Sequence, residues 1–279
     1  MKRSVSQNEM RPVSPEELKR LQIELLESLD RYCQAHDLKY FMSGGTLLGA
    51  VRHHGFIPWD DDIDVVMPRR DYEKLIRQFN SGSAPGCRVV SIFSHPDFYL
   101  PYAKLINTNT VFREHADSSM EIGVNIDIFP IDAMSSSYRK ASRHFDSVAW
   151  SRKKLELKTV PLRAGRAWYK NEVLRLGKLA LSRTTPAEIS KEIDKKAKAF
   201  QAEEDSAYVC VVVNAVYGKN EIIPRDFYSE RVELDFEGRK FWAPKAYDKI
   251  LSRLYGDYMT PPPVEKRISH HAFEAFWKE

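Results

Sequence analysis

The chain has 279 residues, of which 43% are hydrophobic and 29% are charged, and its formal net charge is +4. This length can bury a substantial core, and the composition is ordinary for a soluble globular protein. No stretch approaches the ~18 apolar residues that a membrane-spanning helix requires, which argues against an integral membrane protein of that kind.

The first residues and the cysteines both indicate a cytoplasmic location. Residues 1–14 contain basic side chains but no apolar core after them, so we expect no secretory signal. Cys33, Cys87 and Cys210 are odd in number, far apart and in no C-x-x-C arrangement. They are therefore expected to be reduced packing residues and not zinc ligands.

The first predicted element is an amphipathic helix. The segment Ser14–Glu17 combines a cap residue, a proline at the first helical position and a capping-box glutamate. Apolar side chains then continue at helical spacing, at Leu18, Leu21, Leu25, Leu29 and Tyr32. The helix should run to the region of His36.

A glycine turn between a strand and a helix follows. We expect a short apolar strand near 39–43, a turn at Ser43-Gly44-Gly45, and a helix from Thr46 to Arg52 with Thr46 as its cap. Glycines let the backbone approach a ligand closely, and the amides and dipole of a helix start favour a phosphate. The segment predicts a phosphate cradle, although not a Walker P-loop, because the chain has no G-x-x-x-x-G-K-[ST].

The segment 57–66 carries the most informative spacing in the chain. Its apolar residues predict a buried strand, on which Asp60, Asp62 and Asp64 would emerge on one side because side chains alternate with period two. Carboxylates that close repel unless a cation lies between them. The D-x-D spacing suits a hard divalent cation such as Mg²⁺, which completes its shell with water and substrate phosphate. The alternative is an acidic turn whose charges are merely solvated.

The next elements complete the predicted core. They are a helix over 69–80 and strands at 87–93, 102–106 and 124–129. Asp127 interrupts an otherwise apolar strand, where an unpaired charge would be costly, so we choose it as the third carboxylate of the site. A buried salt bridge to an arginine is the alternative. Asp132 follows Pro130 and is expected in a turn or at a helix start.

From Tyr138 to Glu204 the pattern becomes long, charged and helical, with a second proline-containing capping box at Thr185–Glu188. Residues 138–200 contain 17 Lys or Arg against 6 Asp or Glu. One interpretation is a solvated helical face. The other is a segment that approaches an anionic membrane surface or a phosphate-bearing glycan, because clustered cations near such surfaces attract by roughly 1 kcal/mol each. No nucleic-acid-binding motif accompanies the charge.

The C-terminal part predicts a buried strand at 209–213, a hairpin around Glu237-Gly238, and a final helix from Pro244 to Tyr255 that ends at Gly256. The elements together indicate an α/β (α+β) fold around a small mixed sheet. Three parts are expected: a core with the N-terminal helix over 1–135, a basic helical insertion over 136–205, and a C-terminal part over 206–279 that completes the core and the site.

Several long strings resemble one family. They are Ser43–Arg52, Gly55–Val65, Asn125–Asp132, and Tyr255–Met259 through Pro261-Pro262 to His270-His271. In this order they closely resemble the LicD family of phosphocholine transferases, to which the fukutin-type ribitol-phosphate transferases are related. The resemblance implies a nucleotidyltransferase-like core.

The resemblance also implies a site. Asp62 and Asp64 match its D-x-D positions and would hold Mg²⁺ or Mn²⁺. Together with Asp127, chosen above from its place in an apolar strand, they would be catalytic. Asp60 would ligate a second ion or contact substrate. The expected substrate-binding residues are Ser43, Gly44, Gly45, Thr46, Arg52, Lys104, Arg267, His270 and His271. For the histidine pair, the alternative is a surface location without a role.

The implied reaction transfers phosphocholine, or a related alcohol phosphate, from CDP-choline or another CDP-alcohol to a hydroxyl of a cell-surface glycan or its lipid-linked precursor, releasing CMP. A peripheral contact with the inner membrane face is an accompanying expectation, and nucleic acid is not an expected partner. If the moving group is choline, its ammonium should lie against aromatic faces. Aromatic residues near the motifs are Trp59, Tyr102, Trp242, Tyr255 and Tyr258.

Two other functions compete with this one. The first is a nucleotidyltransferase proper, which passes a nucleoside monophosphate to a sugar phosphate or small molecule. The second is a non-enzymatic Ca²⁺-binding module. An EF-hand loop that began at Asp60 would need Gly at its sixth position and Glu at its twelfth, but the chain has Val65 and Asp71 there.

Overall fold

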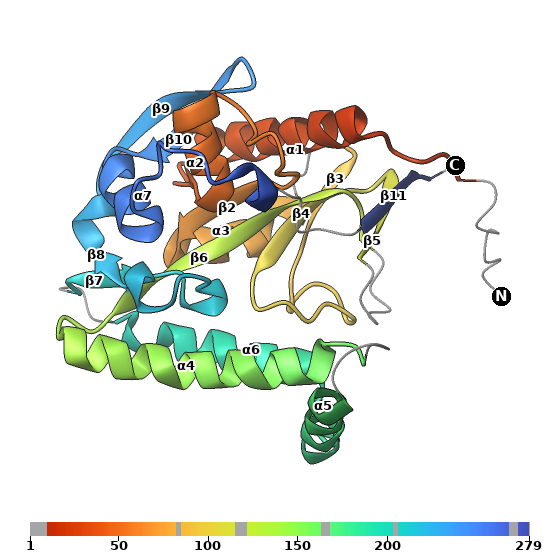
Figure 1. Ribbon diagram of the computed structural model, residues 1–279. Coiled ribbons are helices and arrows are strands. Elements are labelled where there is room, and N and C mark those ends of the chain that lie inside the picture. Colours follow the sequence, from red (N-terminus) through yellow and green to blue (C-terminus); the bar gives the residue numbers. More distant parts are fainter. Residues whose placement is uncertain are drawn as a thin grey trace.

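The computed structural model describes residues 10–81, 85–114, 122–162, 168–202, 206–267 and 273–278. Its centre is a mixed sheet, with helices packed on it and a separate helical layer alongside (Figure 1). This confirms the predicted α+β class. Among the described helices, none is both long enough and apolar enough to cross a bilayer.

The central sheet is built around one long strand. The order of its main path is β1 (Phe41–Met42), β2 (Asp64–Pro68), β6 (Asn125–Met134), β4 (Ala103–Asn107) and β3 (Cys87–Val90). Within the described chain β2 and β6 are parallel, and the other neighbours in this sheet are antiparallel. Two short strands, β7 (Tyr208–Cys210) and β8 (Ile223–Pro224), extend from the far half of β6.

The two faces of this sheet have different partners, because successive strand residues point to opposite sides. On one face, Val65 of β2 and Ile128 of β6 join the main core with α1 (Pro15–Ala35) and α3 (Arg69–Gln78). On the other face, Val66 and Phe129 pack with Ile250 of α7 (Tyr247–Tyr255). Asp64 and Asp127 have the same parity as Val66 and Phe129, so they belong to this second face.

The segment predicted to be helical does contain helices. It consists of α4 (Tyr138–Thr159), α5 (Trp168–Ala180) and α6 (Pro186–Ala197). Both predicted capping boxes are present: Ser14 with Glu17 at the start of α1, and Thr185 with Glu188 at the start of α6. In Figure 1, α4 and α6 lie side by side below the sheet, whereas α5 projects away from the end of α4.

The C-terminal elements agree in part with prediction. The hairpin is β9 (Arg231–Phe236) and β10 (Arg239–Pro244), and α7 ends at Gly256, whose φ is +71°. The strand predicted at 209–213 is shorter, because the chain leaves β7 for a 3₁₀ turn at Val212–Asn214. The structure also contains an antiparallel strand pair that we did not predict, β5 (Thr110–Glu114) with β11 (Phe273–Trp277). This pair places a strand from the C-terminal part of the sequence beside a strand from its middle.

The short elements complete the description. Helix α2 (Gly44–His53) follows β1, and 3₁₀ turns occur at Phe79–Ser81, Lys198–Phe200, Gly218–Glu221, Arg225–Tyr228 and Val264–Lys266.

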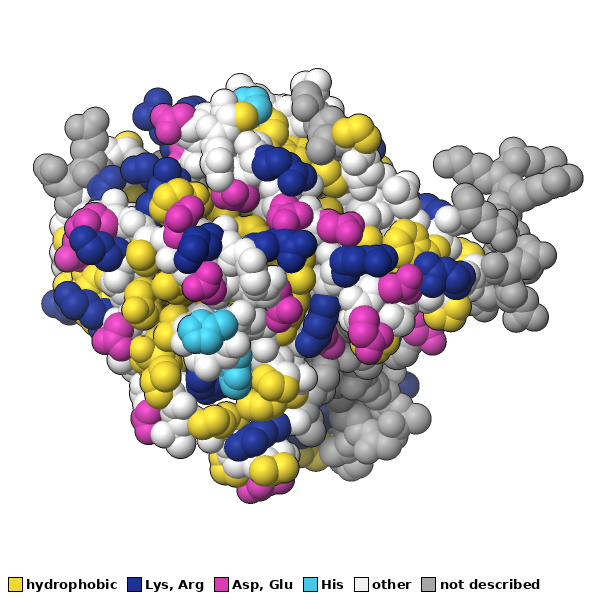
Figure 2. All heavy atoms as spheres, turned by 90° about the horizontal axis from the view of Figure 1, so that it is seen from above, with side chains coloured by type: hydrophobic (Ala, Val, Ile, Leu, Met, Phe, Trp, Pro, Cys, Tyr) yellow, Lys and Arg dark blue, Asp and Glu magenta, His cyan; other side chains and the backbone are white. Residues whose placement is uncertain are grey.

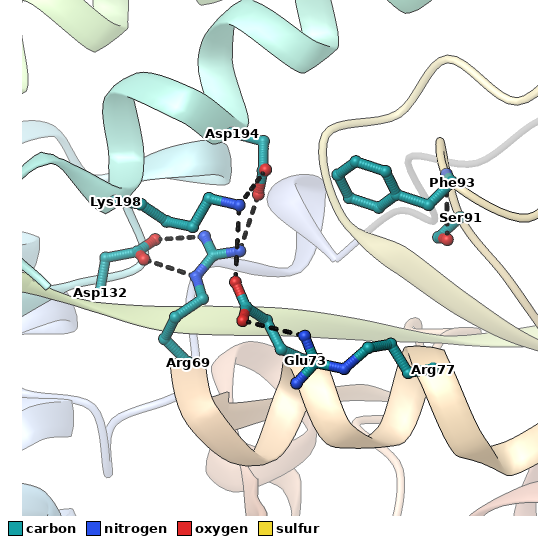
Figure 3. A network of polar contacts seen from close by, with 8 residues as sticks. All are labelled: Arg69, Glu73, Arg77, Ser91, Phe93, Asp132, Asp194 and Lys198. Atoms are coloured by element: carbon teal, nitrogen blue, oxygen red, sulfur yellow. Dashed lines mark hydrogen bonds and ion pairs between the residues drawn. The ribbon is translucent and has the colours of Figure 1, made fainter.

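A buried ionic network connects the sheet to the helical layer (Figure 3). Arg69, the first residue of α3, donates to both carboxylate oxygens of Asp132 on β6 at 2.7 and 2.8 Å and to Asp194 of α6 at 2.7 Å. Lys198 also contacts Asp194, at 2.7 Å. The prediction that Asp132 lies in a turn is therefore wrong, since β6 continues through Pro130 and buries Asp132 completely.

Candidate active site

Two aspartates from neighbouring strands lie opposite one another. The parallel pairing of β2 and β6 puts Asp64 in register with Asp127, and the backbone N–H of Asp127 donates to the carbonyl of Ile63 at 2.9 Å. Both side chains belong to the same face of the sheet, as their strand parity requires. Asp127, chosen from the sequence as the third carboxylate, thus lies on the strand beside Asp64.

Lys104 completes a row across three strands. It faces Asp127 in the antiparallel register of β4 and β6, and its Nζ lies 2.6 Å from Asp127 Oδ1 and 2.9 Å from Asn125 Oδ1. Its side chain is buried. Asp127 is thus in an ion pair, as the alternative interpretation had it, but the partner is a lysine and not an arginine.

Asp60 and Asp62 reach the site from a loop. Strand β2 begins at Asp64, so the prediction that all three aspartates share one strand is wrong. The chain from residue 60 to residue 63 has no regular secondary structure. Their charges nevertheless act on Asp64: burial raises the pKa of Asp64 well above its usual value, and the nearby carboxylates of Asp62, Asp127 and Asp60 raise it further. The carboxylates of Asp60 and Asp62 therefore lie near Asp64, but they are carried by a loop and not by strand β2.

The glycines of the turn make room for these carboxylates. A Cβ on Gly45 would lie 2.3 Å from Asp60 Oδ2, and one on Gly44, whose φ is +54°, would lie 3.0 Å from Asp64 Oδ2. Any larger residue at Gly45 would push the Asp60 carboxylate away. The first turn of α2 thus presents its positive dipole end to the acidic side chains, which favours their ionised form.

The start of α2 differs from the prediction. The helix begins at Gly44 with Ser43 as its N-cap residue, and Ser43 makes no side-chain capping bond. Thr46 is therefore not the cap. Its hydroxyl instead accepts the backbone N–H of Asp64 at 2.8 Å, which ties α2 to the beginning of β2.

Two of the predicted cations lie near one another. Arg52 donates to the carbonyl of Tyr258 at 2.7 Å, and Arg267 lies over the ring of Trp59, with its Cζ 5.4 Å from the centroid. Burial lowers the pKa of Arg52, and the positive charge of Arg267 lowers it further. Arg52 from the N-terminal part of the sequence and Arg267 from the C-terminal part thus form a basic group beside Trp59, which precedes Asp60. His270 and His271 lie outside the described residues.

A pair of tyrosines flanks the carboxylates. The rings of Tyr217 and Tyr255 are T-shaped with centroids 4.9 Å apart. Burial raises the pKa of both phenols, and the negative charges of Asp64 and Asp60 contribute to both shifts. Sequence reasoning selected Tyr255 but missed Tyr217, because it lies in an irregular segment without a motif. Of the other aromatic candidates, Tyr102 packs against Phe129.

Glu221 is a further acidic residue that the sequence did not indicate. Its carboxylate accepts the backbone N–H of Tyr217 at 2.7 Å, and burial raises its pKa from 4.5 to about 7. It lines a cavity of about 30 Å³ together with Ser43. This volume suits a water molecule or two.

Glu221→Gln should change the pH dependence of stability. Because the folded-state pKa is raised, the folded state binds more protons than the unfolded state between pH 4.5 and about 7, so stability falls as pH rises through this window. Glu221 is partly exposed, so we expect a loss of about 1–2 kcal/mol and not the full value of the shift. Urea denaturation at pH 5 and pH 8 should show a larger loss in the wild type than in the variant, which keeps the hydrogen-bond acceptor. Identical pH slopes would contradict the assignment.

The acidic residues of this site can be compared with the ligands that a divalent cation prefers. Within the described part of the chain, no three His, Cys, Asp or Glu side chains already converge closely enough to form a metal site by themselves. Mg²⁺ does not need such a cage, because it usually takes one or two carboxylates and completes its shell with waters and substrate phosphates. A partly buried aspartate with three further carboxylates near enough to raise its pKa, and with Lys104 as an opposing charge, matches that preference.

A comparison with protein families covers the segment that carries these residues. Residues 37–169 match the model described as LicD/FKTN/FKRP, nucleotidyltransferase domain. The chain carries a LicD-family domain. The matched segment includes the glycine turn, the acidic loop, Lys104 and Asp127, so the LicD-family domain contains the whole row of charged residues on the sheet.

Curated relatives extend the comparison beyond this domain. The chain is 27% identical over 266 residues to the lipopolysaccharide cholinephosphotransferase LicD of Haemophilus influenzae, which covers 91% of this chain and 94% of the relative. Uncharacterized proteins of Rickettsia typhi and Rickettsia prowazekii are 37% identical over 59 residues, 20% of this chain in each case and 19% and 22% of the respective relative. The similarity to the Haemophilus protein thus includes the helical layer and the C-terminal part.

Proposed function

We propose that this protein is a phosphotransferase that moves phosphocholine, or a related alcohol phosphate, from a CDP-alcohol to a hydroxyl of a glycan and releases CMP. The observation that carries the proposal is the position of Asp64, in register with Asp127 and near the carboxylates of Asp62 and Asp60, at the first turn of α2. The LicD-family domain and the name of the Haemophilus relative support a phosphotransferase enzyme.

Asp62 and Asp64 would hold a divalent cation, Mg²⁺ or Mn²⁺, and Asp60 would ligate a second ion or contact substrate. When bound, the cation neutralises charge on the diphosphate of the donor. The glycine turn leaves space beside the carboxylates, and the amides of α2 favour an anion there. Arg52 and Arg267 supply positive charge for the nucleotide phosphates.

The chemical step needs one proton acceptor. The acceptor hydroxyl oxygen attacks the phosphorus that bears the alcohol, the bond from that phosphorus to the bridging oxygen breaks, and CMP leaves with that oxygen. Asp127 would take the hydroxyl proton as general base. Lys104, 2.6 Å from Asp127 Oδ1, orients this carboxylate and balances its charge before the substrate arrives.

The flanking aromatic pair favours a cationic alcohol. Tyr217 and Tyr255 lie near enough to Asp64 and Asp60 for these charges to raise the pKa of both phenols, and a quaternary ammonium is attracted to aromatic faces by about 0.5–2 kcal/mol per ring. Choline is therefore the first candidate among the alcohols. Because the relative acts on lipopolysaccharide by its name, we propose a lipopolysaccharide glycan or its lipid-linked precursor as acceptor, on the cytoplasmic side of the membrane.

A nucleotidyltransferase proper is the competing function, since carboxylates at a helix start would serve it equally well. The products distinguish the two. With CDP-choline labelled separately in the choline and the cytidine, Mg²⁺ and a lipopolysaccharide acceptor, we expect choline label on the acceptor and cytidine label in free CMP. EDTA should abolish both. Cytidine label on the acceptor would establish the competing function instead.

A further inference from the structure

A buried amide on α1 contacts the acidic loop. Gln22 is 3% exposed, and its neighbours on the same side of the helix include Leu18 and Leu25, which belong to the hydrophobic core. Its Nε2 donates to the backbone carbonyl of Asp61 at 2.9 Å and, less closely, to that of Asn125 at 3.4 Å. A glutamine therefore occupies a position that the helical pattern assigns to an apolar residue.

The two carbonyls belong to the two segments that carry the carboxylates of the site. Asp61 lies between Asp60 and Asp62 in the loop before β2, and Asn125 begins β6 two residues before Asp127. This loop has no regular secondary structure. A side-chain hydrogen bond in its middle therefore restrains how Asp60 and Asp62 are held relative to Asp127.

The partners of the Gln22 amide fix its orientation. If the group were turned over, Oε1 would face both carbonyl oxygens, which are acceptors as well. In the orientation observed, Oε1 is buried and has no hydrogen-bond partner among the described residues. A buried acceptor without a partner costs stability. Packing alone would be served better by an apolar side chain, so the glutamine is explained by what its Nε2 holds.

Helix α1 lies outside the segment that matches the family model, since that segment begins at residue 37. The exposed side of α1 carries charged side chains such as Arg20 and Glu24. Figure 2 views the molecule from above, the side on which α1 lies in Figure 1, and shows acidic and basic side chains interspersed there. On the buried side of the helix, Gln22 links α1 to the acidic loop inside the LicD-family domain.

We propose that Gln22 is a positioning residue of the metal site, which holds the acidic loop against β6 so that the carboxylates of Asp60 and Asp62 are presented beside Asp64. Removing a group that hydrogen-bonds around metal ligands typically lowers metal affinity by about 10- to 100-fold. The inference rests on the proposed function, in which Asp62 and Asp64 hold Mg²⁺ or Mn²⁺. Gln22 acts through the backbone of the loop and is not itself a ligand.

The test is the affinity of the full chain for Mn²⁺ alone, measured from the electron paramagnetic resonance signal of free Mn²⁺ without nucleotide or acceptor. Gln22→Met keeps the length of the side chain and removes the donor, so we expect the Kd for Mn²⁺ to rise about tenfold or more. The urea midpoint in EDTA should change little, because the loss of the donor is offset by removal of the unpartnered Oε1. Gln22→Leu, a second apolar replacement, should give the same two results.

Gln34→Leu is the matched control. It makes the same change on the same helix, where the exposed Gln34 donates to Asp30 at 2.7 Å, and it should leave the Kd and the urea midpoint at their wild-type values. A wild-type Kd in both Gln22 variants, or wild-type protein that binds no Mn²⁺, would overturn the inference. A raised Kd with an equally large loss of stability would assign Gln22 to the fold instead.

Failure of the proposed function gives a different result. Cytidine label on the acceptor in the product analysis would refute phosphocholine transfer, but it would leave the Mn²⁺ affinities and the role of Gln22 unchanged.

Discussion

Asp64→Asn should lower turnover of CDP-choline by at least about a thousandfold, the scale of losing a central electrostatic group in an active site. Asp64 is half-buried near Asp62, Asp127 and Asp60, and this environment raises its pKa because the charged form is disfavoured without a cation. Asparagine keeps the shape but removes the charge that would hold the metal. The same substitution relieves repulsion, so the free energy of unfolding measured in EDTA should be equal to or higher than that of the wild type. Steady-state kinetics and urea denaturation measure the two effects.

Measuring turnover and the free energy of unfolding together distinguishes a catalytic carboxylate from a structural one. A structural aspartate would lose stability together with activity, whereas Asp64 is expected to lose activity alone. Asp97→Asn makes the same chemical change at an exposed turn outside the acidic cluster and should leave both quantities unchanged. Near-normal turnover of Asp64→Asn would remove Asp64 from the mechanism.

Arg69→Met should destabilise the protein by about 3–5 kcal/mol, the cost of leaving buried charges without their partner. Arg69 makes three hydrogen bonds of 2.7–2.8 Å to Asp132 and Asp194, and its side chain is 2% exposed. In the Arg69→Met variant, the carboxylate of Asp132 would remain fully buried. Asp194 would retain Lys198 as its one ion-pair partner in this network. Urea denaturation followed by circular dichroism measures the loss.

Two further variants test the reason for this loss of stability. Arg77→Met lies on the same helix, but Arg77 is 64% exposed and 3.5 Å from Glu73, so it should cost less than about 1 kcal/mol. Arg69→Met/Asp132→Asn removes a buried charge together with its partner and should recover part of the stability. A loss for Arg69→Met no larger than that for Arg77→Met would show that the network does not hold the helical layer to the sheet.

Local patterns predicted the local features of this protein. The capping boxes at Ser14 and Thr185 both form, because their hydrogen bonds join residues only three apart. The hairpin at Glu237 and the end of α7 at Gly256 depend on local backbone conformations and were also predicted. The alternation of side chains along a strand does not apply to Asp60 and Asp62, since β2 pairs with β6 only from Asp64 onward.

The residue types of the candidate site could be listed from the sequence, but most of their partners could not. Nothing local indicates that Lys104 faces Asp127, that Thr46 holds the backbone of Asp64, or that Tyr217 lies beside Tyr255. These contacts depend on strand register and on loops that return from distant parts of the chain.

The sequence by itself determined the helices, the acidic motif, the glycine turn and the resemblance to the LicD family, because short-range hydrogen bonds and side-chain periodicity are written in neighbouring residues. Only the tertiary structure decided that Asp64 meets Asp127, and that Arg69 pairs both with Asp132, 63 residues away, and with Asp194, 125 residues away. The physical reason is that burial and charge pairing depend on which distant segments pack together. A single segment does not contain that information.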